Sequence, residues 1–196
     1  MKILALIPSF YGSTGYAVNE RQLMEALSKK VNKCFVIAFP SIREGLALFR
    51  KRQNNLPKNM LVLNIPIPHR FLITTVIKML VSYAISIFLL ISRLYKKIEL
   101  IYIRGPVFAV GVLSFKPLTR KTVIKIPGFA EDVIRGETLF HLIDRKLHIL
   151  LDKLVLTRAS KIAVGSMPFY YELVQRRKVK ARNKPLLMPA GINLST

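Results

Sequence analysis

Two glycines that follow an apolar run near the start of the chain could bind a phosphate group. The run Ile3 to Ile7 leads into a loop with Gly12, Ser13, Thr14 and Gly15, after which a helical pattern begins. Glycines there let backbone N–H groups approach an anion, and the positive end of the helix dipole favours negative charge. The loop lacks the Lys-Ser/Thr pair of a P-loop and the third glycine of a dinucleotide motif. A plain strand-to-helix turn is therefore the alternative.

Two residues that end or follow later apolar runs are candidates for contacts with an anion or another polar ligand. Arg104 ends the run Leu100 to Arg104, and its forked guanidinium could hold a phosphate or a carboxylate. Ser166 follows the run Lys161 to Val164 and is also placed to cap the next helix. An ordinary surface ion pair is the alternative for Arg104.

Paired carboxylates follow another apolar run. Glu131 and Asp132 come shortly after the run Thr122 to Ile126 and are weak candidates for catalytic groups. Such carboxylates could orient sugar hydroxyls or act as a general base. Acidic residues in the first turn of a helix also stabilise its dipole, so helix capping is the alternative.

A third set of polar residues has the spacing of a metal site. Asp144, His148 and Asp152 lie four residues apart, on one face of a helical pattern. Basic residues stand among them: Arg145, Lys146 and Lys153. The pattern therefore favours a solvated polar face, and we predict no metal site.

The elements that must position these residues alternate along the chain. Strands are predicted at Ile3–Ile7, Cys34–Phe39, Met60–Ile65, Leu100–Arg104, Thr122–Ile126, Lys161–Val164 and Leu186–Met188. Helices are predicted at Ala17–Lys29, Ile42–Arg52, Phe71–Lys96, Val107–Phe115, Thr138–Arg158 and Pro168–Lys178. The strands are continuous apolar runs, which is typical of strands covered on both faces. The pattern predicts an α/β fold with a doubly wound, Rossmann-like parallel sheet over residues 1–188, whose ligands bind at the carboxyl ends of the strands.

Composition restricts the partners. The chain has 196 residues, is 52% hydrophobic and carries a formal net charge of +22, so it is a folded and strongly basic protein rather than a disordered tail. Nucleic acid, anionic lipid and phosphorylated small molecules would all be attracted. Six basic residues fall between Arg176 and Lys184 with no aromatic residue among them, which makes nucleic acid the less favoured partner.

One predicted helix is apolar enough to concern a membrane. Between Phe71 and Ser92 the only charge is Lys78, and the polar residues fall within an arc of about 120°. The helix could be buried against a sheet, lie in a membrane interface or span the bilayer. The first residues lack the features of a signal peptide, and the single cysteine, Cys34, suits a reducing compartment. We expect a cytoplasmic protein. If the helix lies in a membrane interface, the protein would be peripheral on the membrane.

The order of these segments resembles the N-terminal, acceptor-binding domain of GT-B glycosyltransferases of the family 4, glycogen-synthase-like type. Four segments carry the resemblance: the Gly15 loop with its helix ending at Leu27, Tyr102 to Pro106, Ala159 to Ser166, and Met188 to Asn193. The last is similar to the start of the family's interdomain linker, so residues 189–196 would open that linker. A C-terminal donor domain would follow.

The resemblance implies an enzyme that transfers a hexose from a nucleotide-sugar, its co-substrate, to a sugar or lipid-linked acceptor with retention. No other cofactor is expected, and this half alone should be inactive. The family's histidine after the fifth strand is absent, because Pro127, Gly128 and Phe129 occupy that region. Two other classes stay open: a basic α/β module that binds nucleic acid, and a scaffold subunit for a separate donor-domain protein.

Overall fold

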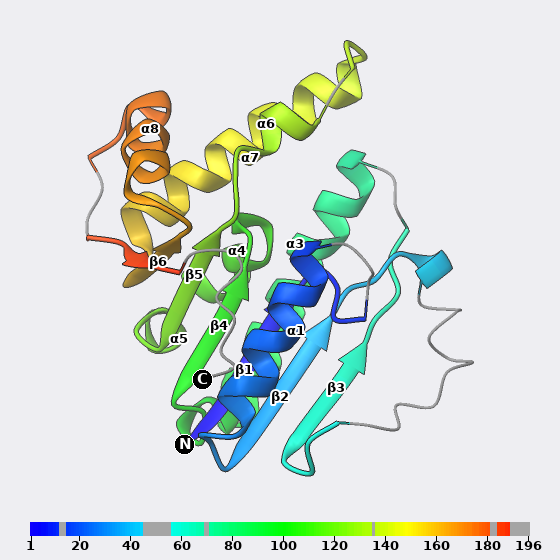
Figure 1. Cartoon of the computed structure of the whole chain (residues 1–196). Helices are drawn as coiled ribbons and strands as arrows, with labels where there is room; N and C mark the ends of the chain where they lie inside the picture. Colours follow the sequence, from blue (N-terminus) through cyan, green and yellow to red (C-terminus); the bar gives the residue numbers. More distant parts are fainter. Residues whose placement is uncertain (12–14, 45–55, 69–70, 135, 181–183, 189–196) are drawn as a thin grey trace.

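A single parallel sheet forms the centre of the molecule. The computed structural model describes residues 1–11, 15–44, 56–68, 71–134, 136–180 and 184–188 (Figure 1). Seven strands lie in the order β3-β2-β1-β4-β5-β6-β7, and every neighbouring pair is parallel. They are β1 Lys2–Ile7, β2 Lys33–Ala38, β3 Met60–Asn64, β4 Leu100–Arg104, β5 Thr122–Ile126, β6 Lys161–Val164 and β7 Leu186–Leu187. The predicted doubly wound α/β fold is confirmed.

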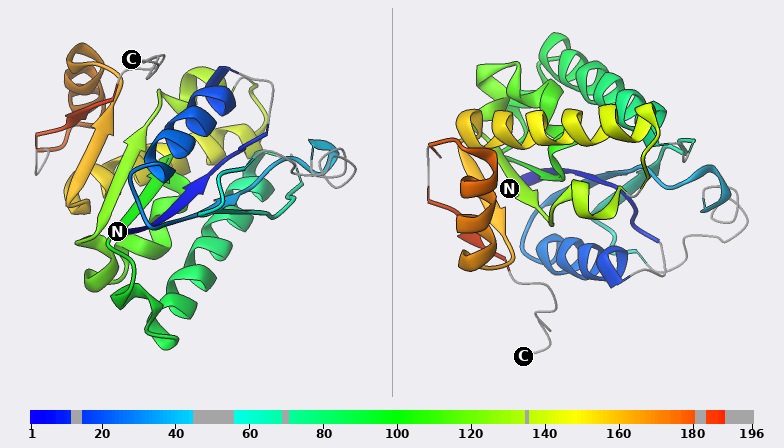
Figure 2. Two further views of the ribbon diagram at one scale, coloured as in Figure 1. Left: turned by 60° about the horizontal axis from the view of Figure 1, so that its bottom comes forward. Right: turned by 90° about the horizontal axis from the view of Figure 1, so that it is seen from above.

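Helices cover both faces of this sheet. The longer ones are α1 Gly15–Ser28, α3 Phe71–Ile91, α7 Leu139–Arg158 and α8 Met167–Arg177. The shorter ones are η1 Leu94–Lys96, η2 Pro106–Phe108, α4 Ala109–Leu113, α5 Lys116–Thr119 and α6 Ala130–Val133. Helix α1 lies on one face, and α3, α4 and α7 lie together on the other (Figure 2).

Alternate side chains of each strand supply the two halves of the core. In β1, Ile3, Ala5 and Ile7 pack in the cluster that contains Met24 of α1. Leu4 and Leu6 belong to the cluster on the opposite face. Because both faces are covered, the strand consists of apolar residues without polar alternation, as the sequence pattern indicated.

Two predicted helices are shorter than expected. The helix predicted over Phe71–Lys96 ends at Ile91, and Arg93 adopts a left-handed φ of 56° before η1. The helix predicted over Val107–Phe115 is divided into η2 and α4, and α5 then begins at Lys116 with Pro117 in its first turn. Proline is tolerated in the first turn of a helix, because the N–H that it lacks would have no partner within the helix there. Most of the helix predicted over Ile42–Arg52 lies outside the described residues.

Helix α3 is oriented with its polar residues inward. Ser82 and Ser86 are fully buried, and Thr74 and Thr75 are buried as well. The Ser82 hydroxyl donates to the Phe108 carbonyl oxygen at 2.5 Å and accepts from the Gly111 N–H at 3.2 Å. The polar arc therefore faces the protein, the reverse of what a helix buried by its apolar face would show. By length and composition alone, Leu72–Ile91 could cross a membrane.

Helix α7 shows the same reversal. The face that carries Asp144, His148 and Asp152 was predicted to be solvated, and that prediction was wrong. Asp144 and Asp152 are each only 2% exposed, whereas Leu139, Phe140 and Leu150 on the same helix are more than 60% exposed. The basic neighbours suggested solvent, but the acidic face of the helix lies against α3 and α8.

Candidate functional site

The carboxyl edge of the sheet brings together most of the residues singled out from the sequence. The first residues of α1, the end of β4, the turn after β5 and the start of α8 all follow the carboxyl ends of parallel strands (Figure 1). Gly15 opens α1, while Gly12, Ser13 and Thr14 lie outside the described residues. The role of this loop in phosphate binding stays a prediction.

A buried carboxylate organises the charges at the ends of β4 and β5. Glu20 of α1 is fully buried and accepts a hydrogen bond from the Tyr102 hydroxyl at 2.8 Å. Arg104 and Lys125 both donate to its Oε1, the lysine Nζ at 3.1 Å. Two cations thus share one carboxylate at this edge. Burial and the Glu20 charge raise the pKa of Tyr102, so its hydroxyl stays protonated and donates.

The sequence pointed to Arg104 but missed its partners. Arg104 forms an ion pair, but with the fully buried Glu20 rather than at the surface, as the alternative had it. Its role as an acceptor or anion contact stays a prediction, now shared with Lys125. One signal for Glu20 was present, since it follows Ala17 by three residues and precedes Met24 by four, which places it on the buried face of its helix.

The two candidate catalytic carboxylates are both paired with arginines of α8. Glu131 accepts two hydrogen bonds from Arg177, at 2.6 and 2.7 Å. Arg177 is 2% exposed and also donates to Asp152 Oδ2 from Nε at 3.0 Å and from Nη2 at 2.6 Å. Asp132 is more exposed, and its carboxylate lies 3.4 Å from Arg176.

These contacts set the protonation of the carboxylates. Burial acts to raise the pKa of Glu131, but the hydrogen bonds and charge of Arg177 outweigh it and hold that pKa below its ordinary value. For Asp152, burial prevails over Arg177 and raises the pKa to about 6. A carboxylate with a low pKa is a weak base, so Glu131 suits charge stabilisation or hydroxyl binding better than proton abstraction. A catalytic role for Glu131 or Asp132 stays a prediction.

Ser166 acts as a helix cap. Its Oγ accepts a hydrogen bond from the Phe169 N–H at 3.3 Å, at the first turn of α8. Arg176 lies over the Phe129 ring at 4.1 Å from its centroid, and Phe169 packs against the same ring at 5.0 Å. The start and the end of α8 are therefore both tied to the turn after β5. Contact between Ser166 and a ligand stays a prediction.

Two polar atoms near the same edge lack hydrogen-bond partners among the described residues. They are the Tyr11 hydroxyl, which follows β1, and Asn64 Oδ1, at the last position of β3. A buried polar atom without a partner is costly, and a bound ligand or water can supply the missing bond. Neither residue was singled out from the sequence, although a polar residue at the end of an apolar strand was a visible signal.

Asp144 and His148, whose spacing raised the possibility of a metal site, belong to a buried polar cluster between α3 and α7. His148 Nε2 lies 3.9 Å from Asp144 Oδ1 and 3.5 Å from the Thr75 hydroxyl. Burial lowers the pKa of His148 and that of Lys78, while the Asp144 charge opposes both shifts. Asp152 is bonded to Arg177 instead. Within the described ranges, no group of three His, Cys, Asp or Glu side chains could hold a metal ion.

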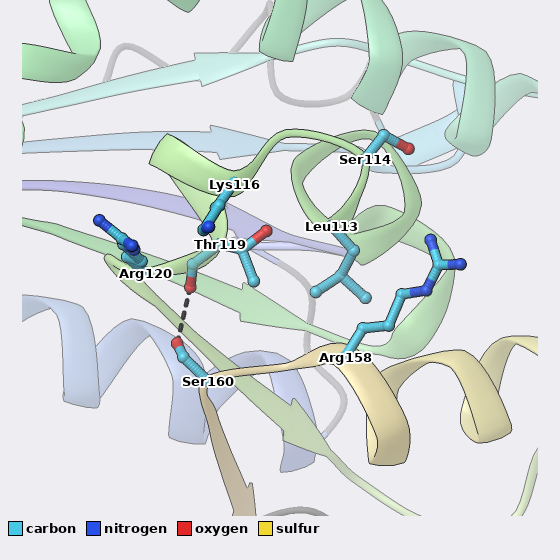
Figure 3. A pocket seen from close by; sticks show the side chains of 7 residues that line it. All are labelled: Leu113, Ser114, Lys116, Thr119, Arg120, Arg158 and Ser160. Carbon is cyan, nitrogen blue, oxygen red and sulfur yellow. Dashed lines mark hydrogen bonds between the residues drawn. The ribbon is translucent and has the colours of Figure 1, made fainter.

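A cationic hollow of about 750 Å³ lies at the opposite, amino-terminal end of the sheet (Figure 3). Lys116, Arg120 and Arg158 line it, together with hydroxyl-bearing residues. Those hydroxyls donate to backbone carbonyls, as Ser160 Oγ does to the Thr119 carbonyl at 2.6 Å. Because the hollow lies away from the carboxyl edge, it does not belong to the candidate site.

Comparison with known proteins identifies the fold. No family model and no curated protein sequence matches the chain. Among solved structures, sucrose-phosphate synthase from Thermosynechococcus elongatus matches 99% of this chain with a TM-score of 0.62 and 17% identity. A UGT transferase from Siraitia grosvenorii, solved in complex with UDP, matches 100% of this chain with a TM-score of 0.56 and 10% identity.

The chain spans about half the length of both proteins, 49% of the synthase and 52% of the UGT transferase. A second structure of the synthase gives a TM-score of 0.52 with 97% of this chain covered. At these identities the likeness concerns the fold. The chain is folded like one Rossmann-like half of a GT-B glycosyltransferase.

Proposed function

We propose that the chain is the acceptor-binding half of a glycosyltransferase that moves a hexose from a nucleotide-sugar to an acceptor. One observation carries the proposal: almost the whole chain matches one half of a sucrose-phosphate synthase, and the same half-length match recurs in a UGT transferase bound to UDP. The finer assignments are further parts of the proposal: the family 4 type, retention of configuration, and a donor domain after the segment 189–196.

The charges at the carboxyl edge suit the chemistry of such a transfer. A departing nucleoside diphosphate develops negative charge, which fixed positive groups stabilise. Arg104 and Lys125 lie beside Glu20 at this edge and would supply two such positive groups. The N–H groups at the start of α1, after Gly15, would add to that field. The donor half would supply the remaining contacts with the nucleotide.

We further propose a lipid-linked acceptor at the cytoplasmic face of an anionic membrane. Support comes from the net charge of +22, the exposed lysines Lys178, Lys180 and Lys184, and the exposed apolar residues of α3 and α7.

A transfer assay on the native protein tests the proposal. The protein would be captured from its source cells, and radiolabelled nucleotide-sugars would be supplied with a lipid extract of the same cells. We expect label to move into the lipid fraction. Replacement of Gly15 by valine should lower transfer without unfolding the protein. Arg120→Gln, at the opposite end of the sheet, should leave transfer unchanged.

The rival class is a nucleic-acid-binding module, which the net charge of +22 favours. It predicts binding to RNA or DNA that falls steeply with salt concentration, and no transfer with any nucleotide-sugar. That pair of results would replace the glycosyltransferase proposal. A scaffold role predicts instead that transfer appears only when a separate donor-domain protein is added.

A further inference from the structure

The outward face of α3 is a continuous apolar stripe. Its members are Ile73, Val76, Leu80, Ala84, Ile87, Phe88 and Ile91. Leu80 and Phe88 are 62% and 61% exposed, and Ile91 is 79% exposed. At 100° per residue these positions fall within an arc of about 120°, opposite the buried serines and threonines. Contiguous exposed apolar surface of this kind marks an interaction site.

A groove of about 520 Å³ adjoins this stripe. Its floor is the outer face of β2 and β3, with Phe35, Ile37, Leu61 and Leu63, and its wall is α3, where Phe88 belongs to both the groove and the stripe. Leu61 and Leu63 are 62% and 53% exposed, although they lie on a strand of the sheet.

The topology explains why this part of the sheet is uncovered. Strand β3 is at the edge of the sheet, and the chain returns from it to β4 through α3, past β2 and β1. Helices α3, α4 and α7 therefore gather over the middle of the sheet (Figure 2). The opposite face of β2 and β3 packs in the same core cluster as Met24 of α1.

Cations line one end of the groove. Lys2 and Lys33 begin β1 and β2, and Lys97 precedes β4, so all three lie at the amino-terminal end of the sheet. In the described part of the chain, none of the three is ion-paired. Glu99, whose N–H donates to the Lys2 carbonyl, has its carboxylate paired with the N-terminal amine at 3.6 Å. Arg93 and Lys96 are exposed nearby, at the end of α3.

We propose that this groove binds an anionic phospholipid of a bilayer, with an acyl chain along Phe35, Leu61 and Phe88 and the phosphate at Lys2, Lys33 and Lys97. The stripe of α3 then enters the interface beside it. This deepens the membrane part of the proposed function, but lipid binding needs neither the donor nor the acceptor of the transfer reaction.

Charge selects this occupant over a second copy of the chain. A second copy would bring another +22 charges, and the lysine end of the groove would repel it. An anionic bilayer offers both required chemistries at the right positions, an apolar interior for the stripe and phosphate groups for the lysines.

Vesicle co-sedimentation of the whole chain tests the lysines. Vesicles of phosphatidylcholine alone would be compared with vesicles of equal parts phosphatidylcholine and phosphatidylglycerol. Reversal of two charges in Lys33→Glu/Lys97→Glu should weaken binding to the anionic vesicles at least about tenfold. The matched control, Lys116→Glu/Arg120→Glu, changes the net charge equally in the hollow of Figure 3 and should weaken it far less.

Fluorescence quenching tests the apolar contact. The sequence contains no tryptophan, so Phe88→Trp introduces a single tryptophan, in the groove, and Tyr171→Trp places one on the exposed part of α8. Phospholipids with brominated acyl chains should quench the Phe88→Trp variant and leave the Tyr171→Trp variant unchanged.

Three results would overturn the assignment. Equal loss of vesicle binding in the two charge-reversal variants would show unspecific attraction. Absence of quenching in the lipid-bound Phe88→Trp variant would place the groove outside the bilayer. A third result concerns the same variant without lipid: if its tryptophan emission shifted to the blue as the protein concentration rose, a second copy would fill the groove. None of these results depends on transferase activity, which is measured separately.

Discussion

Glu20 and Arg104 form an ion pair in which the carboxylate is fully buried and the guanidinium is 11% exposed. The two residues are 84 positions apart, and the pair links α1 to the carboxyl end of β4. Lys125 joins the same carboxylate from β5, at 3.1 Å. This cluster ties the first helix to two central strands directly below the candidate site.

Replacement of Glu20 should destabilise the fold strongly. In Glu20→Gln the two cations lose their shared counter-charge, and loss of one partner of a buried ion pair costs about 3 to 5 kcal/mol. Tyr102→Phe removes only the hydroxyl that donates to Glu20, and about 1 kcal/mol is expected. Urea denaturation of both variants measures the difference. Equal effects would contradict the ion-pair account.

Arg177 should matter far more than its neighbour. Arg177→Met leaves Glu131 and Asp152 without their shared partner inside the protein, and a loss of about 3 to 5 kcal/mol in the free energy of unfolding is expected. Arg176 is exposed and bonds Glu172 and Asp132 on the surface, so Arg176→Met should have little effect. A large effect of the second variant would mean that the Phe129 contact, not the buried pair, secures α8.

A side chain at position 111 should disrupt the packing of α3 on α4. A Cβ at Gly111 would lie 2.4 Å from the backbone carbonyl carbon and oxygen of Ser82. Gly111→Ala should therefore cost about 1 to 3 kcal/mol through overpacking. A Cβ at Gly128 meets nothing within 4 Å, so Gly128→Ala should be nearly neutral. Thermal unfolding compares the two, and similar stabilities would disprove the close contact.

His148 should make stability depend on pH. Burial lowers its pKa, and the charges of Lys78 and Arg177 act in the same direction, against those of Asp144 and Glu131. The unfolded chain therefore takes up a proton at this residue before the folded one does. The contribution of neutral His148 is fully present above a pH of about 6.5 and is lost as the pH falls below it.

His148→Gln removes this titration and keeps a polar side chain. The stability of the wild-type protein should fall more steeply than that of the variant between pH of about 7 and 5. Urea denaturation across that range measures both slopes. Parallel slopes would show that His148 is protonated equally in the folded and unfolded chains.

The strands were predictable because most are short continuous apolar runs, which are typical of a parallel sheet whose central strands are covered on both faces. The break at Arg93 and the division of the segment 107–113 into η2 and α4 were harder to place, because helical periodicity continues across both. The inward polar faces of α3 and α7 could not be predicted, since an amphipathic pattern defines two faces and does not say which one meets the protein.

The sequence predicted where the candidate site residues lie better than it predicted which residues they contact. Arg104, Glu131 and Ser166 lie at the carboxyl edge as strand order required, because strand ends are local features of the sequence. The contacts of Arg104 with Glu20 and of Glu131 with Arg177 depend on how distant elements pack. Only the cap between Ser166 and Phe169 is local in the sequence. The lysine-lined groove likewise joins Lys2, Lys33 and Lys97, which only the fold brings to one edge.

Transfer of a labelled sugar by the native protein tests the central claim most directly. The protein captured from its source cells would be incubated with each labelled nucleotide-sugar and a lipid extract, and its intact mass would be measured in the same sample. The account predicts label in the lipid fraction and a mass well above 22.4 kDa, because a donor half is expected to follow. Absence of transfer with every donor, together with salt-sensitive binding to nucleic acid, would contradict it.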